Sequence, residues 1–162
     1  MKDERSVPMT PVIPVLISMN SFSQTDPTGR EPADPIRLLV PGELTIESGV
    51  YTLRYEESQT DEDTKAVITQ HITLTMVPGR VTMTREGMFS TTMIFVRGQR
   101  FEGAYHTPYG DLEMAVYATR ADCELSPTAG NVNLQYTLDM QGAFAAMNTL
   151  EITWAARLPK QS

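Results

Sequence analysis

The chain of 162 residues has few of the residues from which catalytic and metal sites are built. It contains one cysteine, Cys123, and two histidines, His71 and His106. A single cysteine excludes an intramolecular disulfide, which fits a reducing compartment. Neither histidine has a partner at metal-ligand spacing, and Cys123 has no evident histidine partner. Because Gly-x-Ser-x-Gly motifs and glycine-rich phosphate loops are also missing, we expect no catalytic residue, no metal and no cofactor.

Positive charge and long apolar runs are scarce as well. Thirteen Lys and Arg residues stand against 20 Asp and Glu, which gives a net charge of -7 and a pI near 4.8. Such a chain is repelled by phosphate backbones and anionic lipid surfaces, so we expect neither nucleic acid nor membrane as a partner. No segment approaches the ~20 apolar residues of a membrane span. Residues 1–20 also lack a positively charged leader with an unbroken apolar stretch, so we expect a cytoplasmic protein.

Apolar and polar residues alternate with a period of two along most of the chain, which is the pattern of half-buried strands. In residues 66–77, for example, Ile72, Leu74 and Met76 share one face, and threonines and His71 occupy the other. Comparable stretches occur at residues 12–22, 35–47, 50–57, 81–84, 91–97, 99–107, 111–118, 132–140 and 150–156. Dipeptides that favour turns separate these stretches, and Pro41-Gly42 and Gln141-Gly142 are two of them. Residues 143–148 are expected to form an irregular hairpin loop.

The number and spacing of these stretches predict an all-β fold. Each strand has one apolar face, and a sheet can cover that face and remove its exposed edges by closing on itself. We therefore expect an antiparallel β-barrel of about 8–10 strands. One domain should span residues 1–162, with a disordered tail at residues 1–10 and a mobile loop at residues 24–34, which is rich in Pro, Gly, Asp and Thr.

Four segments resemble the YwiB-like proteins, a family of small bacterial proteins of unknown function. They are Leu-Arg-Tyr-Glu-Glu at 53–57, Val-x-Met-x-Arg-x-Gly at 81–87, Tyr-x-Thr-Pro-Tyr-Gly at 105–110 and Leu-x-Tyr-x-Leu at 134–138. The third segment is the most specific, and the resemblance runs from about residue 12 to residue 156. It implies a calycin-like, lipocalin-type barrel, but no activity, cofactor or catalytic residue.

Charged residues on faces that otherwise look inward are the main candidates for a site. Glu57 shares a face with Leu53 and Tyr55, and Arg85 shares one with Val81 and Met83. One interpretation is a structural ion pair, or strand-end charges that reach solvent. The other is an anion site in the barrel lumen, where guanidinium groups bind a carboxylate or phosphate between tyrosine walls. Its candidate ligand-binding residues are Tyr55, Glu57, Arg85, Arg97, Tyr105, Thr107, Tyr109 and Tyr136.

Ten methionines are a second unusual feature. Four of them, Met76, Met83, Met93 and Met114, fall at positions that the alternation turns inward. Methionine suits both an adaptable ligand lining and ordinary core filling, and core filling is the favoured interpretation.

Three functions are compatible with these features. The leading hypothesis is a non-catalytic barrel that binds a small molecule in its lumen, an anion being one class that Arg85 would suit. The alternative is a structural or protein-interaction module with a packed interior, which could form a homodimer. A hydrolase is the weakest hypothesis, because the expected lumen has too few carboxylates and arginines for that chemistry.

Overall fold

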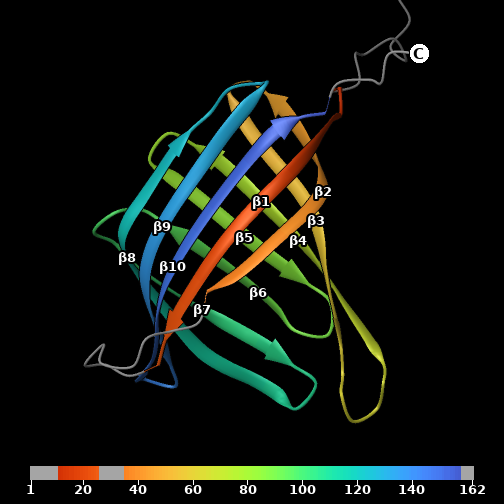
Figure 1. Ribbon diagram of the computed structural model, residues 1–162. Coiled ribbons are helices and arrows are strands. Elements are labelled where there is room, and N and C mark those ends of the chain that lie inside the picture. Colours follow the sequence, from red (N-terminus) through yellow and green to blue (C-terminus); the bar gives the residue numbers. More distant parts are fainter. Residues whose placement is uncertain (1–10, 26–34, 158–162) are drawn as a thin grey trace, which may run out of the picture.

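A computed structural model describes residues 11–25 and 35–157. These residues form ten β-strands (Figure 1): β1 (Ile13–Gln24), β2 (Ile36–Glu47), β3 (Val50–Thr60), β4 (Val67–Val77), β5 (Arg80–Glu86), β6 (Ser90–Phe95), β7 (Arg100–Thr107), β8 (Gly110–Glu124), β9 (Ala129–Met140) and β10 (Ala143–Ala156). Nothing in the described ranges forms a helix with the length and apolar character needed to cross a membrane. The tail expected at residues 1–10, and all but the first two residues of the loop expected at 24–34, lie outside the described residues.

The strands close into an antiparallel barrel in which each strand pairs with its neighbours in sequence. The first strand, β1, closes the barrel by pairing with β10 on one edge and with β2 on the other. Its pairing with β10 runs from Val15, opposite Ala156, to Gln24, opposite Met147. The result is an up-and-down barrel, and the predicted all-β fold is confirmed.

The interior is densely filled in one half of the barrel. Around the β2–β3 and β4–β5 turns, Leu44 pairs with Leu53 and Leu53 pairs with Leu74, and all three side chains are fully buried. The Trp154 ring packs across its partner Gly130, where a Cβ atom would collide with it. The four methionines at positions 76, 83, 93 and 114 are buried, as the alternation predicts.

Two local expectations are wrong. Pro41-Gly42 is not a turn but lies inside β2. Proline is tolerated in a strand where its missing N–H faces no partner, and β2 pairs with β3 only from Glu43 onward. Residues 143–148 do not form a loop but begin β10, with a bulge between Phe144 and Ala146. Because a bulge inserts an extra residue, it breaks the period of two from which a strand is recognised.

Candidate functional site

The barrel wall is split between β2 and β3. These strands pair only where Glu43–Glu47 faces Val50–Arg54, although β2 begins at Ile36 and β3 continues to Thr60. Beyond the paired part, β2 remains with β1 and β3 remains with β4. Figure 1 shows β2 following β1, whereas β3 runs with β4 as a long hairpin on the other side of the split. Residues 36–42 and 55–60 therefore face each other across an opening in the wall.

Gly42 lies at the point where the two strands separate. A Cβ atom at this position would collide with the Ile17 side chain and lie 2.8 Å from the carbonyl oxygen of Arg54. Only glycine lets β2 approach both neighbours this closely. Gly42 thus permits the close contact between β2 and its two neighbours at the end of the paired part.

A cavity of about 1010 Å³ opens through this split into the barrel interior. Apolar side chains from β2 form its entrance wall, among them Ile36, Leu38 and Val40. Inside, it is lined by further apolar side chains and by a polar group of residues that we call the polar base: Tyr55, Glu57, Arg85, Tyr136 and Asn148. Charged and polar residues, among them Glu43, Arg54, Glu56 and His71, also line the cavity. A concave site in which polar groups converge beside apolar side chains is a candidate small-molecule site.

The centre of the polar base is an ion pair. Nη1 of Arg85 donates a hydrogen bond to Oε1 of Glu57 at 2.9 Å, and the side chains are 28% and 19% exposed. Burial alone would lower the pKa of Arg85, but the charge and hydrogen bond of Glu57 raise it above its ordinary value. Within the described chain each side chain makes this one hydrogen bond, which leaves Oε2 of Glu57 and the other N–H groups of Arg85 without a partner among the described residues. Both residues line the cavity.

Two buried tyrosines complete the polar base. Tyr55 is 5% exposed, and its hydroxyl has no hydrogen-bond partner among the described residues. Leaving such a group unpaired costs about 1–3 kcal/mol. Burial, followed by the Glu57 charge, raises the pKa of Tyr55 above its ordinary value. Burial also raises the pKa of Tyr136, although a hydrogen bond with the Asn148 side chain opposes the shift.

The structure therefore brings together four of the eight predicted site residues: Tyr55, Glu57, Arg85 and Tyr136. The predicted structural ion pair is present, and it lies at the cavity where the second interpretation places a binding site. These two interpretations do not exclude each other.

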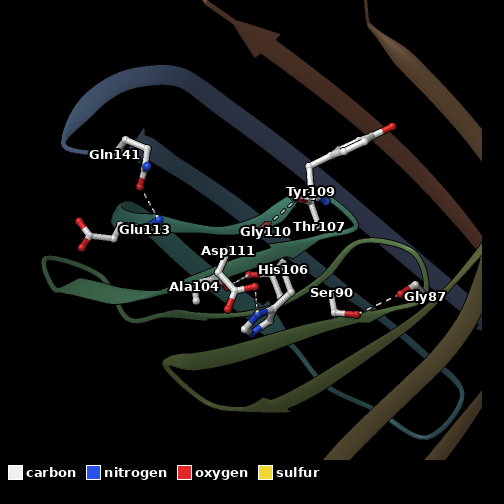
Figure 2. A network of polar contacts seen from close by, with 11 residues as sticks. Gly87, Ser90, Ala104, His106, Thr107, Tyr109, Gly110, Asp111, Glu113 and Gln141 are labelled. Atoms are coloured by element: carbon white, nitrogen blue, oxygen red, sulfur yellow. Dashed lines mark hydrogen bonds and ion pairs between the residues drawn. The ribbon is translucent and has the colours of Figure 1, made fainter.

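The other four predicted residues do not line this cavity. Arg97 is exposed, because β6 ends at Phe95 and the inward alternation ends with it. Tyr105 is half-buried and packs against Phe89, with ring centroids 6.1 Å apart. Thr107 donates from its hydroxyl to the Gly110 carbonyl at 2.7 Å and holds the β7–β8 turn. Tyr109 in that turn is 97% exposed and points away from the hairpin (Figure 2).

Several residues of the site were not predicted from the sequence. Ile36, Leu38 and Val40 are ordinary strand residues in sequence, and their role depends on the missing β3 partner. The consecutive apolar residues Leu38, Leu39 and Val40 depart from strict alternation and are the one available signal. Asn148 shares the inward face of β10 with Leu150 and Ile152, but it lies in the segment 143–148 that was expected to form a loop, so it was not considered as a site residue.

The histidines and the cysteine lie outside the polar base. His106 is exposed, as expected, and its Nδ1 lies 2.8 Å from Oδ1 of Asp111 (Figure 2). His71 pairs with Glu56 at 3.3 Å on the outer rim of the cavity. The Cys123 thiol donates to the Val77 carbonyl at 3.4 Å, and burial raises its pKa. Within the described ranges, no three or more His, Cys, Asp or Glu side chains gather in a way that could hold a metal ion.

Comparison with known proteins agrees with this architecture. A family model described as a domain of unknown function (DUF1934) matches residues 17–152. The crystal structure of the YwiB protein from Bacillus subtilis is similar to this chain with a TM-score of 0.76 and 18% identity, over 91% of this chain and 94% of that chain. At this identity the likeness concerns the fold. No curated protein matches the chain. The resemblance found in the sequence is thereby confirmed, and the chain belongs to the DUF1934 family, a family of unknown function.

Proposed function

We propose that this protein is a non-catalytic binding protein that takes one small molecule into the barrel through the β2–β3 split. The observation that carries the proposal is the cavity of about 1010 Å³, with apolar walls and the polar base at its inner end. Small-molecule sites commonly have volumes of about 300–1,000 Å³. The interior of a small β-barrel can hold one small ligand, as in lipocalins.

The lining favours a ligand with an apolar body and a polar head. Leu38, Val40 and Met83 would contact the body, while Glu57 and Arg85 would meet the head. Glu57, the carboxylate of the polar base, is held by Arg85 at 2.9 Å, which favours a role in binding over one as a general base. Binding is therefore the better supported function.

Native mass spectrometry of protein purified gently from a bacterial expression strain tests the proposal. We expect a one-to-one complex with a co-purifying small molecule. The matched variants are Leu38→Trp, which places an indole in the cavity entrance, and Leu39→Trp on the exposed opposite face of β2. The complex should be lost in the first variant and retained in the second. A clean ligand-free mass for the wild type would count against the proposal.

A second candidate function is protein interaction, and the open edge of β2 favours it. From Ile36 to Gly42 this strand pairs with β1 alone, and Leu39 is 66% exposed. Unpaired apolar edges accept a strand from another chain, including a second copy. Light scattering after size-exclusion chromatography would show a dimer that Leu39→Lys dissociates, because a charge on an edge strand opposes pairing. A monomer at all concentrations would contradict a homodimer.

A further inference from the structure

The ligand that fits the polar base has a neutral head that donates and accepts hydrogen bonds side by side. We propose that this head is a primary amide or a group of the same hydrogen-bonding pattern, and not a simple anion. This inference rests on the proposed function and names the chemical class of the ligand.

The ion pair leaves part of its hydrogen-bonding capacity unused. Glu57 uses Oε1 for Arg85, and Arg85 uses Nη1 for Glu57. Both residues line the cavity, and an acceptor, Oε2 of Glu57, and the remaining donors of Arg85 have no hydrogen-bond partner among the described residues. An amide satisfies both at once, because its N–H donates to Oε2 and its carbonyl accepts from the guanidinium.

The charge of the cavity lining does not favour an anion. Three carboxylates line it, those of Glu43, Glu56 and Glu57, against two guanidinium groups, those of Arg54 and Arg85. The formal balance of these carboxylates and guanidinium groups is one negative charge. An anion entering this cavity would meet an excess of negative charge, and it would have to displace Glu57 from Arg85. The predicted second cation, Arg97, is not there to compensate.

The polar groups beside the ion pair are neutral. Tyr55 has a buried hydroxyl with no partner in the described part of the chain, and the Asn148 amide lines the same cavity. Both can donate to or accept from a neutral group. Neither supplies the positive charge that recognition of an anion requires.

The test compares two ligands of the same length, octanamide and octanoate. Each displaces a neutral fluorescent probe, phenylnaphthylamine, from the wild-type protein near neutral pH. We expect octanamide to bind about tenfold more tightly or better, because a site built for one hydrogen-bonding pattern discriminates against the other. In Glu57→Gln the unpaired Arg85 should reverse this preference in favour of octanoate. The matched control is Glu56→Gln, since Glu56 is exposed at the rim and pairs with His71.

Each outcome decides between the claims. A wild-type preference for octanoate overturns the inference, as does equal affinity for the two compounds, while saturable probe binding still supports the proposed function. If neither the probe nor either compound binds, the proposed function itself fails and the inference with it. The wild-type comparison requires no substitution, so it holds even if Glu57→Gln does not fold.

Discussion

Arg85 and Glu57 form their ion pair across an intervening strand. Arg85 belongs to β5 and Glu57 to β3, and the 2.9 Å hydrogen bond between them passes over β4, which pairs with both. The pair thus connects three strands at the inner end of the cavity. Because the side chains are largely but not fully buried, each charge depends on the other for compensation.

Removing one member of this pair should destabilise the fold. We expect Arg85→Met and Glu57→Met each to lower the free energy of unfolding by about 1–2 kcal/mol, since the remaining charge is left partly buried. The double variant should lose less free energy of unfolding than the two single variants lose together. Urea denaturation measures all three. As a control, Arg120→Met removes an exposed pair with Asp122 at 2.7 Å and should change stability by about 0.5 kcal/mol or less.

The two buried tyrosines should respond in opposite directions to loss of the hydroxyl. Tyr55→Phe removes a group without a partner in the described chain and should raise the free energy of unfolding by about 1 kcal/mol. Tyr136→Phe removes a hydrogen bond with Asn148 and should lower it by about the same amount. Chemical denaturation of refolded, ligand-free protein measures both. Equal effects would refute the assignment of Tyr55 as the unpaired group.

Stability should fall at alkaline pH because of the same residues. The pKa of Tyr55 and that of Tyr136 are raised above the ordinary value of 10.0, so the folded state keeps protons that the unfolded state releases. The contribution of these two tyrosines to the free energy of unfolding is therefore fully present below about pH 10. Above that pH it decreases by about 1.4 kcal/mol per pH unit for each of the two groups. Above pH 10, the urea midpoint of Tyr55→Phe should fall less steeply with increasing pH than that of the wild type. Tyr109→Phe, at an exposed position, should match the wild type, and identical slopes in both variants would contradict the account.

Gly42 should be intolerant of a side chain although it lies in a strand. Gly42→Ala would drive a methyl group into Ile17 and against the Arg54 carbonyl, and we expect a loss of about 1–3 kcal/mol. The comparison is Gly103→Ala in β7. The only side chain that its added Cβ would meet is the Phe101 ring, at 3.0 Å. Thermal unfolding should show the larger loss at Gly42. A neutral Gly42→Ala would mean that β2 does not approach β3 there as described.

The fold could be predicted from the sequence because the period of two persists through strands that pair with sequence neighbours. Tyr55, Glu57, Arg85 and Tyr136 were identified correctly as inward-facing because their strands alternate without interruption. Arg97 was misplaced because its strand ends two residues earlier. The split itself was not predictable, since it depends on which residues of β2 find a partner in β3, and alternation carries no information on pairing.

The central claim, that a small molecule binds in the cavity behind the β2–β3 split, is tested most directly by titrating phenylnaphthylamine fluorescence. The wild type, Leu38→Trp and Leu39→Trp are compared under the same conditions. The account predicts saturable one-to-one binding to the wild type and to Leu39→Trp, and an affinity at least about tenfold lower for Leu38→Trp, whose side chain occupies the entrance. Equal binding to the two tryptophan variants, or no saturable binding to the wild type, would contradict it.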